Sequence, residues 1–152
     1  MMSSLSTVLE SCEGFYLILD TSVLMNIGSG RPSLENLCDA TGTLPVLIIP
    51  RAVLAELENL TAESRPSTKL KAITALKVLR ETKLCKVVFL NESISSHADD
   101  EVFLIAKKLA SAKCRVAVAT SDKALRRRCR MIGIPTVFLR ETQLRFYSDY
   151  QF

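Results

Sequence analysis

The chain has 152 residues, of which 48% are hydrophobic and 24% are charged, as is ordinary for one globular domain with a sizeable core. No apolar run reaches the roughly 18 residues that span a bilayer, and no basic segment precedes an apolar one at the N-terminus. We therefore expect neither a membrane span nor a signal peptide. The five cysteines are scattered without a CxxC pair. This pattern argues against a disulfide framework or zinc knuckle and favours a reducing, intracellular compartment, with most cysteines packing as small hydrophobes.

The net charge of +4 conceals an asymmetry along the chain. Residues 1–101 carry 9 Lys and Arg against 13 Asp and Glu, whereas residues 102–152 carry 11 against 3. The first part is therefore acidic and the second strongly basic. A basic half is typical of proteins that bind polyanions, although cationic helix faces are also often simply solvated.

Segments of strand length and segments of helical spacing alternate along the chain. After a loose lead-in or short helix at 1–14, apolar runs without alternation predict buried parallel strands at 15–19, 44–49, 86–90, 115–119 and 136–139. Helices are predicted at 21–27, 32–40, 51–60, 69–84, 95–111 and 123–132, with a loop at 61–68. This order predicts an α/β domain over residues 15–140, with three layers (α/β/α) around a central parallel sheet of about five strands.

The helix predicted at 69–84 has the clearest amphipathic pattern. Lysines and arginines occupy its other faces, so we expect its apolar stripe to be buried. The stripe consists of Leu70, Ile73, Leu76, Leu79 and Leu84.

The final segment, 141–152, holds four of the nine aromatic residues. Aromatic side chains in such a tail can stack on unpaired bases. Packing on the domain itself or on a second copy is the favoured interpretation.

Acidic residues recur where the predicted strands end. Asp20 follows the first strand and Asp122 the fourth, while Asp99 opens the helix after the third strand and Glu56 lies on the helix after the second. Taken singly, the three aspartates are typical of helix N-termini, and Glu56 of a solvated helix position.

Taken together, the four acids favour a metal site. Adjacent parallel strands end about 5 Å apart, so carboxylates at that edge would converge, and two like charges 4 Å apart repel by roughly 4 kcal/mol at an effective dielectric of 20. Ser or Thr would cap the helices without that repulsion. A divalent cation removes it, and oxygen ligands without His or Cys suit Mg²⁺ or Mn²⁺ rather than zinc. Such an ion activates water and neutralises charge on a phosphate.

Four segments resemble the motifs of the PIN domain, a metal-dependent nuclease fold. They read LILDTSVLMN, IPRAVLAELENL, ADDEVFLIAKKL and VAVATSDKALRRR, and the resemblance covers residues 16–139. It is strongest to the branch that includes archaeal VapC-like proteins and the PIN proteins of eukaryotic ribosomal RNA processing. The resemblance implies a Mg²⁺- or Mn²⁺-dependent endoribonuclease, with Asp20, Glu56, Asp99 and Asp122 as catalytic and metal-binding residues.

The resemblance also implies roles for neighbouring residues. Asp99 is preferred over Asp100 because the motif has a small helix residue seven positions on, here Ala106. Asp100 is then an accessory acid. Ser22 matches a position that often carries Asn or Ser near the metal, and Thr120 matches a hydroxyl beside the last acid.

The predicted helix after Asp122 is rich in arginine. Its cations could contact RNA phosphates beside the metal. Alternatively, they could form a solvated helix end that the helix dipole favours. The sequence does not decide between these two interpretations. These residues are Lys123, Arg126, Arg127, Arg128 and Arg130. Arg51, Lys107 and Lys108 are weaker candidates, and His97, the single histidine, is interpreted as a surface or capping residue.

The implied partners follow from the nuclease interpretation. RNA is the expected substrate, and family precedent adds a homodimer, an antitoxin or a pre-ribosomal particle, with no membrane. The location is then cytoplasmic, or nucleolar in a eukaryote. The alternative is a catalytically inactive PIN-like module that binds RNA or supports assembly.

Overall fold

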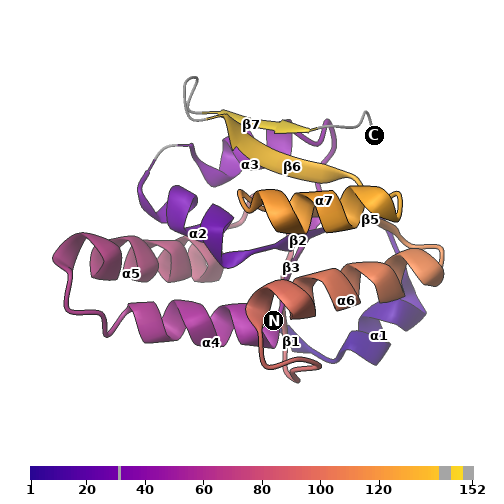
Figure 1. Cartoon of the computed structure of the whole chain (residues 1–152), viewed down its shortest axis with the longest axis horizontal. Coiled ribbons are helices and arrows are strands. Elements are labelled where there is room, and N and C mark those ends of the chain that lie inside the picture. The colour runs from indigo at the N-terminus through magenta and orange to yellow at the C-terminus, as the bar shows by residue number, and fades with distance from the viewer. Residues whose placement is uncertain (31, 141–144, 149–152) are drawn as a thin grey trace.

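The structure, a computed structural model, describes residues 1–30, 32–140 and 145–148. Its strands form one sheet in the order β1-β4-β3-β2-β5-β6-β7 (Figure 1). Neighbouring strands are parallel except β7, which is antiparallel to β6. The strands are β1 (Met2–Ser3), β2 (Phe15–Leu19), β3 (Val46–Ile49), β4 (Val87–Leu90), β5 (Arg115–Ala119), β6 (Thr136–Arg140) and β7 (Arg145–Ser148).

Helices connect the strands and cover the sheet (Figure 1). They are α1 (Leu5–Ser11), α2 (Thr21–Gly28), α3 (Leu34–Asp39), α4 (Arg51–Leu60), α5 (Pro66–Glu81), α6 (Ala98–Ser111) and α7 (Lys123–Met131). Helix α5 packs against α2 and α4, while α6 packs against α4, β5 and α7. The predicted three-layer α/β/α class is confirmed.

Strand β2 lies at the centre of the sheet. All five of its residues are buried, and it pairs with β3 on one side and β5 on the other. Both faces of the strand are therefore covered, which is why its sequence is apolar throughout instead of alternating. The residue that follows β2 is consequently held at the middle of the sheet's carboxyl edge.

Both ends of the chain add to the sheet beyond the five predicted strands. Residues 1–14, expected to be a loose lead-in or short helix, form β1, which pairs with β4, and α1. In the tail, β7 pairs with β6, Phe146 is buried, and its backbone N–H donates to Asn36 Oδ1 over 2.9 Å. These contacts place the described part of the tail on the domain itself, whereas Tyr150 and Phe152 lie outside the described residues.

Helix α5 corrects two predictions. It begins at Pro66 and not near 69, because proline is compatible with the first turn of a helix. The predicted stripe is also only partly buried. Leu76 and Leu79 are in the core, but Leu70 is 64% exposed and Ile73 is 44% exposed. Alanines 72 and 75 are completely buried in their place.

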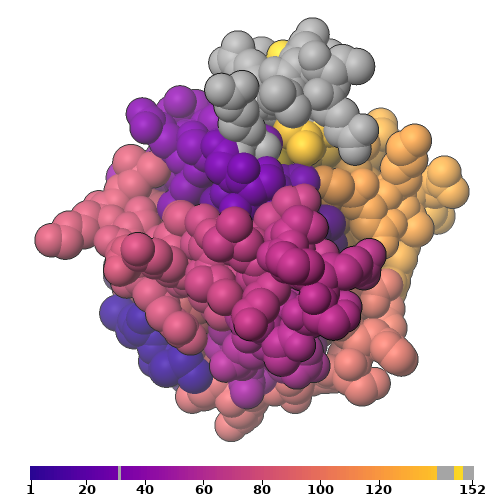
Figure 2. Space-filling view, turned by 90° about the vertical axis from the view of Figure 1, so that its left-hand side faces the viewer, coloured from indigo at the N-terminus to yellow at the C-terminus, as the bar shows by residue number. Residues whose placement is uncertain are grey.

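Close packing of α2 against α5 explains the choice of face. A Cβ atom at Gly28 would collide with the backbone carbonyl of Lys71. Such a short approach leaves room only for small side chains between the helices, so α5 turns its alanines inward. The larger Leu70 is exposed. Helix α5 forms much of the face seen in Figure 2.

One pair of cysteines forms a disulfide that the sequence pattern did not predict. Cys38 and Cys129 are buried, as predicted for small hydrophobes. Cys12, just after α1, is instead joined by a disulfide to Cys114, just before β5. The two are 102 positions apart in sequence, so no local spacing indicated the pair.

Among the described residues, no helix combines the length and the apolar character needed to cross a bilayer.

Candidate active site

The pairing register of β2 and β5 decides which residues meet at the edge of the sheet. Leu19 pairs with Ala119 at the ends of the two strands, and the N–H of Asp20 donates to the carbonyl of Ala119 over 3.0 Å. The next residue on each chain, Asp20 and Thr120, is therefore brought to the same point of the sheet edge. Two segments separated by 100 positions meet there.

Asp20 is held by hydroxyl groups and does not cap its helix. It occupies the N-cap position of α2, but its side chain makes no capping hydrogen bond. Its Oδ2 accepts from Thr120 Oγ1 over 2.7 Å and from Ser22 Oγ over 3.2 Å. Only 7% of Asp20 is exposed. The helix-cap explanation therefore does not account for this buried carboxylate.

Burial raises the pKa of the Asp20 carboxyl above its usual value. Hydrogen bonds from the Thr120 hydroxyl, the Thr21 backbone and the Ser22 hydroxyl act in the opposite direction, and the charge of Asp122 adds a smaller increase. The charge of the acid that follows β5 therefore acts on the acid that follows β2.

Asp122 combines a capping role with a place in the site. Its Oδ1 accepts from the backbone N–H groups of Ala124 (2.8 Å) and Leu125 (3.3 Å), which caps α7. Its own N–H donates to Thr120 Oγ1 over 3.0 Å. The capping interpretation is thus correct for one oxygen of Asp122, while the residue also lines the pocket shared with Asp20.

Glu56 on α4 and Asp99 on α6 line the same pocket, which has a volume of about 470 Å³. Both residues are in contact with solvent. Partial burial raises the pKa of Glu56, and the charge of Asp20 and then that of Asp99 raise it further, while the Thr21 hydroxyl lowers it. The structure therefore brings together all four acids that the sequence singled out. His97, whose side chain makes no capping bond, also lines the pocket.

Ser22 and Thr120, expected as accessory residues, join the acids into one network. The Ser22 hydroxyl lies 3.5 Å from the Thr120 hydroxyl and accepts from the backbone N–H of Ser121 over 3.0 Å. The loop after β5 is thereby fixed to the first turn of α2.

Asp100 is directed to a cation on the neighbouring helix. Its Oδ1 pairs with Nη1 of Arg128 over 2.8 Å, and the guanidinium of Arg128 lies 4.3 Å from the ring centre of Phe103. Asp100 does not line the pocket. Its contact joins α6 to α7 beside the site.

The basic residues of α7 divide into two groups. Arg128 is engaged with Asp100, and the guanidinium of Arg126 stacks 3.7 Å from the ring centre of Phe138. Lys123, Arg127 and Arg130 are exposed. Together with Arg126 and Met131 they line a separate hollow of about 480 Å³.

The acids provide the hard oxygen donors that Mg²⁺ and Mn²⁺ prefer. Within the described ranges, no group of three or more His, Cys, Asp or Glu side chains is close enough to coordinate one metal ion. Because Mg²⁺ usually keeps several waters and takes one or two carboxylates directly, the residues fit a hydrated ion better than a closed cage.

Sequence reasoning missed one acid near this site. Glu101 is completely buried and accepts hydrogen bonds from three backbone groups. It lies in an acidic first turn that already contained two candidate ligands, and nothing in the local pattern distinguished it from a solvated residue.

Comparisons with known proteins agree with this fold. Among solved structures, the chain is similar to the PIN domain endonuclease Utp24, with 22% identity over 88% of this chain and 90% of that one and a TM-score of 0.61. It is also similar to a domain of a functionally unknown protein from Methanocaldococcus jannaschii DSM 2661, with 23% identity, coverage of 84% and 92%, and a TM-score of 0.62. The comparison with curated proteins finds no match. At these identities the solved structures establish a shared fold. The family model described as "PIN like domain" matches residues 17–142, and the chain therefore belongs to the PIN-like domain family.

Proposed function

We propose that this protein is a Mg²⁺- or Mn²⁺-dependent endoribonuclease that hydrolyses RNA phosphodiester bonds. The observation that carries the proposal is the pocket at the carboxyl edge of the sheet, which is lined by four acids from α4, α6 and the N-cap positions of α2 and α7. Membership of a nuclease family supports it. A set of mutually repelling carboxylates reduces stability unless it binds a cation.

The four acids of the pocket would hold the ion, directly or through water. They are Asp20, Glu56, Asp99 and Asp122. When bound, a divalent ion lowers the pKa of a coordinated water and stabilises the negative charge that develops on the phosphate.

Two hydroxyls prepare Asp20 for this task. Thr120 and Ser22 both donate to Oδ2 of Asp20, and such bonds favour the ionised carboxylate and fix its orientation. They oppose the effect of burial, which favours the protonated form.

RNA would approach over α7. Lys123, Arg127 and Arg130 are exposed on the helix that Asp122 caps. Their charges would attract the phosphates that flank the scissile bond. In this proposal Arg126 and Arg128 contribute to the positive field while they pack against Phe138 and Asp100.

The test is cleavage of single-stranded and structured RNA by the purified protein with Mn²⁺. Cleavage by the wild type and loss of at least about a hundredfold in Asp20→Asn would support the proposal. It fails if the wild type cleaves no RNA, or if Asp20→Asn cleaves as fast as the wild type.

One observation favours a second candidate, a PIN-like module that binds RNA or supports assembly without turnover. In the part of the chain that the structure describes, the acids are not gathered tightly enough to hold an ion as they stand. Calorimetric titration with Mn²⁺ separates the two candidates. The nuclease should bind Mn²⁺ in a manner that depends on Asp99, whereas the inactive module should show no such binding.

Two biological roles are compatible with this activity. The first is ribosomal RNA processing, with a pre-ribosomal particle as partner, and the second is that of a VapC-like toxin bound by an antitoxin. A homodimer is compatible with both. Sequencing of RNA ends in cells that express the wild type or Asp99→Asn distinguishes them, because processing should alter ribosomal precursor ends and a toxin should cut mature RNA.

A further inference from the structure

Glu101 is a completely buried acid in the first turn of α6. It follows Asp99 by two positions, and residues two apart on a helix do not share a face. Asp99 lines the acidic pocket and Glu101 does not. Glu101 therefore does something other than add a fifth acid to the site.

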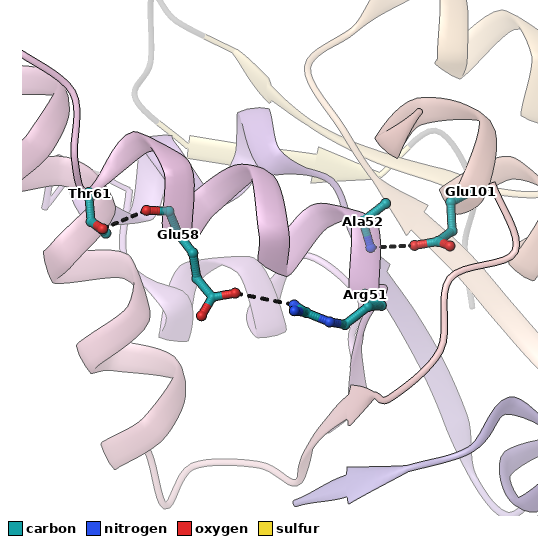
Figure 3. Close-up of polar contacts among 5 residues, drawn as sticks. All are labelled: Arg51, Ala52, Glu58, Thr61 and Glu101. Atoms are coloured by element: carbon teal, nitrogen blue, oxygen red, sulfur yellow. Dashed lines mark hydrogen bonds and ion pairs between the residues drawn. The ribbon is translucent and has the colours of Figure 1, made fainter. Parts of the chain in front are cut away.

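Both oxygens of Glu101 accept hydrogen bonds from backbone groups. Oε2 accepts from the N–H of Ala52 over 2.5 Å, as Figure 3 shows. Oε1 accepts from the N–H of Ile94 over 2.6 Å and from that of Ser95 over 3.4 Å. One carboxylate thus joins the start of α4 to the segment that precedes α6.

The bond to Ala52 caps α4. The N-cap residue of this helix is Pro50, which makes no side-chain capping bond. The first N–H groups of a helix lack partners within it and attract negative charge. Glu101 supplies that charge from another element. Ala52 lies one turn before Glu56, so the two residues share a face of α4.

The bonds to Ile94 and Ser95 fix the other side of the pocket. These residues lie in the segment between β4 and α6, which continues directly into His97 and Asp99. The pocket residues of this segment and of α4 are therefore anchored to the same buried group.

We propose that Glu101 is a positioning residue, which locks α4 to the segment before α6 and so sets the placement of Glu56 relative to Asp99. The consequence for catalysis rests on the proposed nuclease function. The consequence for geometry does not, and it is measured separately.

The first experiment uses metal-free protein and NMR. In Glu101→Gln, one oxygen is replaced by an NH₂ group that cannot accept, so at least one of the two anchors must break. We expect faster amide exchange at Ala52, Ile94 or Ser95 and altered chemical shifts at Glu56 and Asp99. The matched control is Glu58→Gln, which removes an exposed ion pair with Arg51 on the same helix (Figure 3) and should leave these signals unchanged. Unchanged exchange and shifts in Glu101→Gln would overturn the proposal.

The second experiment measures Mn²⁺ affinity and RNA cleavage well below the unfolding temperature. Glu101→Gln should bind Mn²⁺ about 10-fold more weakly and lower kcat by about 10-fold or more, with KM for RNA changed by no more than about twofold. A merely structural role would lower thermal stability and leave the affinity and kcat of the folded protein at wild-type values. That result would overturn the catalytic part of the proposal.

A negative result for Glu101 can be told apart from failure of the proposed nuclease function. If the wild type neither binds Mn²⁺ nor cleaves RNA, the proposed function is wrong and the NMR comparison alone decides the role of Glu101. If Glu101→Gln does not fold, Glu101→Asp takes its place. It keeps the charge but is one methylene shorter, so it should weaken the anchors and give the same changes at Glu56 and Asp99, whose absence would overturn the proposal.

Discussion

Thr120 donates its hydroxyl hydrogen to Oδ2 of Asp20 over 2.7 Å, across 100 positions of sequence. Thr120 is completely buried, and its oxygen also accepts from the N–H of Asp122 over 3.0 Å. One hydroxyl therefore connects the acid after β2 with the acid after β5. This contact depends on the parallel register of the two central strands.

Replacing Thr120 by valine tests that connection. Thr120→Val keeps the shape but leaves the Asp122 N–H without its acceptor and Asp20 without its shortest donor. We expect a loss of about 1–3 kcal/mol in the free energy of unfolding, measured with denaturant, because buried groups lose their partners. Thr120→Ser should retain most of the stability. Thr61→Val, which removes an exposed bond to the Glu58 carbonyl, serves as the control, and an equal loss in both valine variants would contradict the expectation.

Asp20→Asn should stabilise the metal-free protein. Burial, with a smaller effect from Asp122, raises the pKa of Asp20 in the folded state, so the native protein binds this proton more tightly than the unfolded chain does. The contribution of Asp20 to stability is therefore lost as the pH rises through the raised pKa. We expect Asp20→Asn to be more stable than the wild type near pH 8, and the difference to shrink towards pH 4. Denaturation in a chelator checks this, and a wild type that is the more stable protein near pH 8 would contradict it.

Two leucines of α5 should differ sharply in their effect on stability. Leu76 is 6% exposed and Leu70 is 64% exposed. Leu76→Ala should cost about 2–5 kcal/mol through lost burial and a cavity, whereas Leu70→Ala should stay within about 0.5 kcal/mol of the wild type. Thermal or chemical denaturation measures both. Equal losses would mean that α5 buries the stripe predicted from its sequence.

The same helix shows where sequence reasoning was insufficient. Helical periodicity correctly identified α5 as amphipathic but favoured the stripe with the largest side chains. The buried face instead carries Ala72 and Ala75, and on the partner side Gly28 of α2 lies so close to the backbone of Lys71 that no Cβ would fit. The distance between two helices is a tertiary property, and a single segment does not contain it.

The site was more predictable than the helix packing. Strand length and the acid after each strand are local patterns, and a parallel sheet necessarily brings such residues to one edge. Asp20, Glu56, Asp99 and Asp122 were singled out on that basis together with the resemblance to PIN motifs, and the structure places all four around one pocket. The hydrogen-bond partners of Asp100 and Glu101 lie on other elements, so their different contacts could be read only from the structure. The Cys12–Cys114 disulfide was missed for the same reason.

The neighbouring acids Asp99 and Asp100 have different surroundings, and only Asp99 is a proposed metal ligand of the pocket. Asp99 lines the pocket, whereas Asp100 pairs with Arg128 at the half-exposed surface between α6 and α7. The two substitutions to asparagine change the same charge one position apart, so each controls for the other. An ion pair of this exposure contributes at most about 1 kcal/mol to stability, and both variants should fold.

The decisive measurement is the single-turnover rate of RNA cleavage with Mn²⁺ for the wild type and these two variants. We expect a rate at least about a hundredfold lower in Asp99→Asn and a rate within about threefold of the wild type in Asp100→Asn. Equal rates in the two variants, or a larger loss in Asp100→Asn, would contradict it.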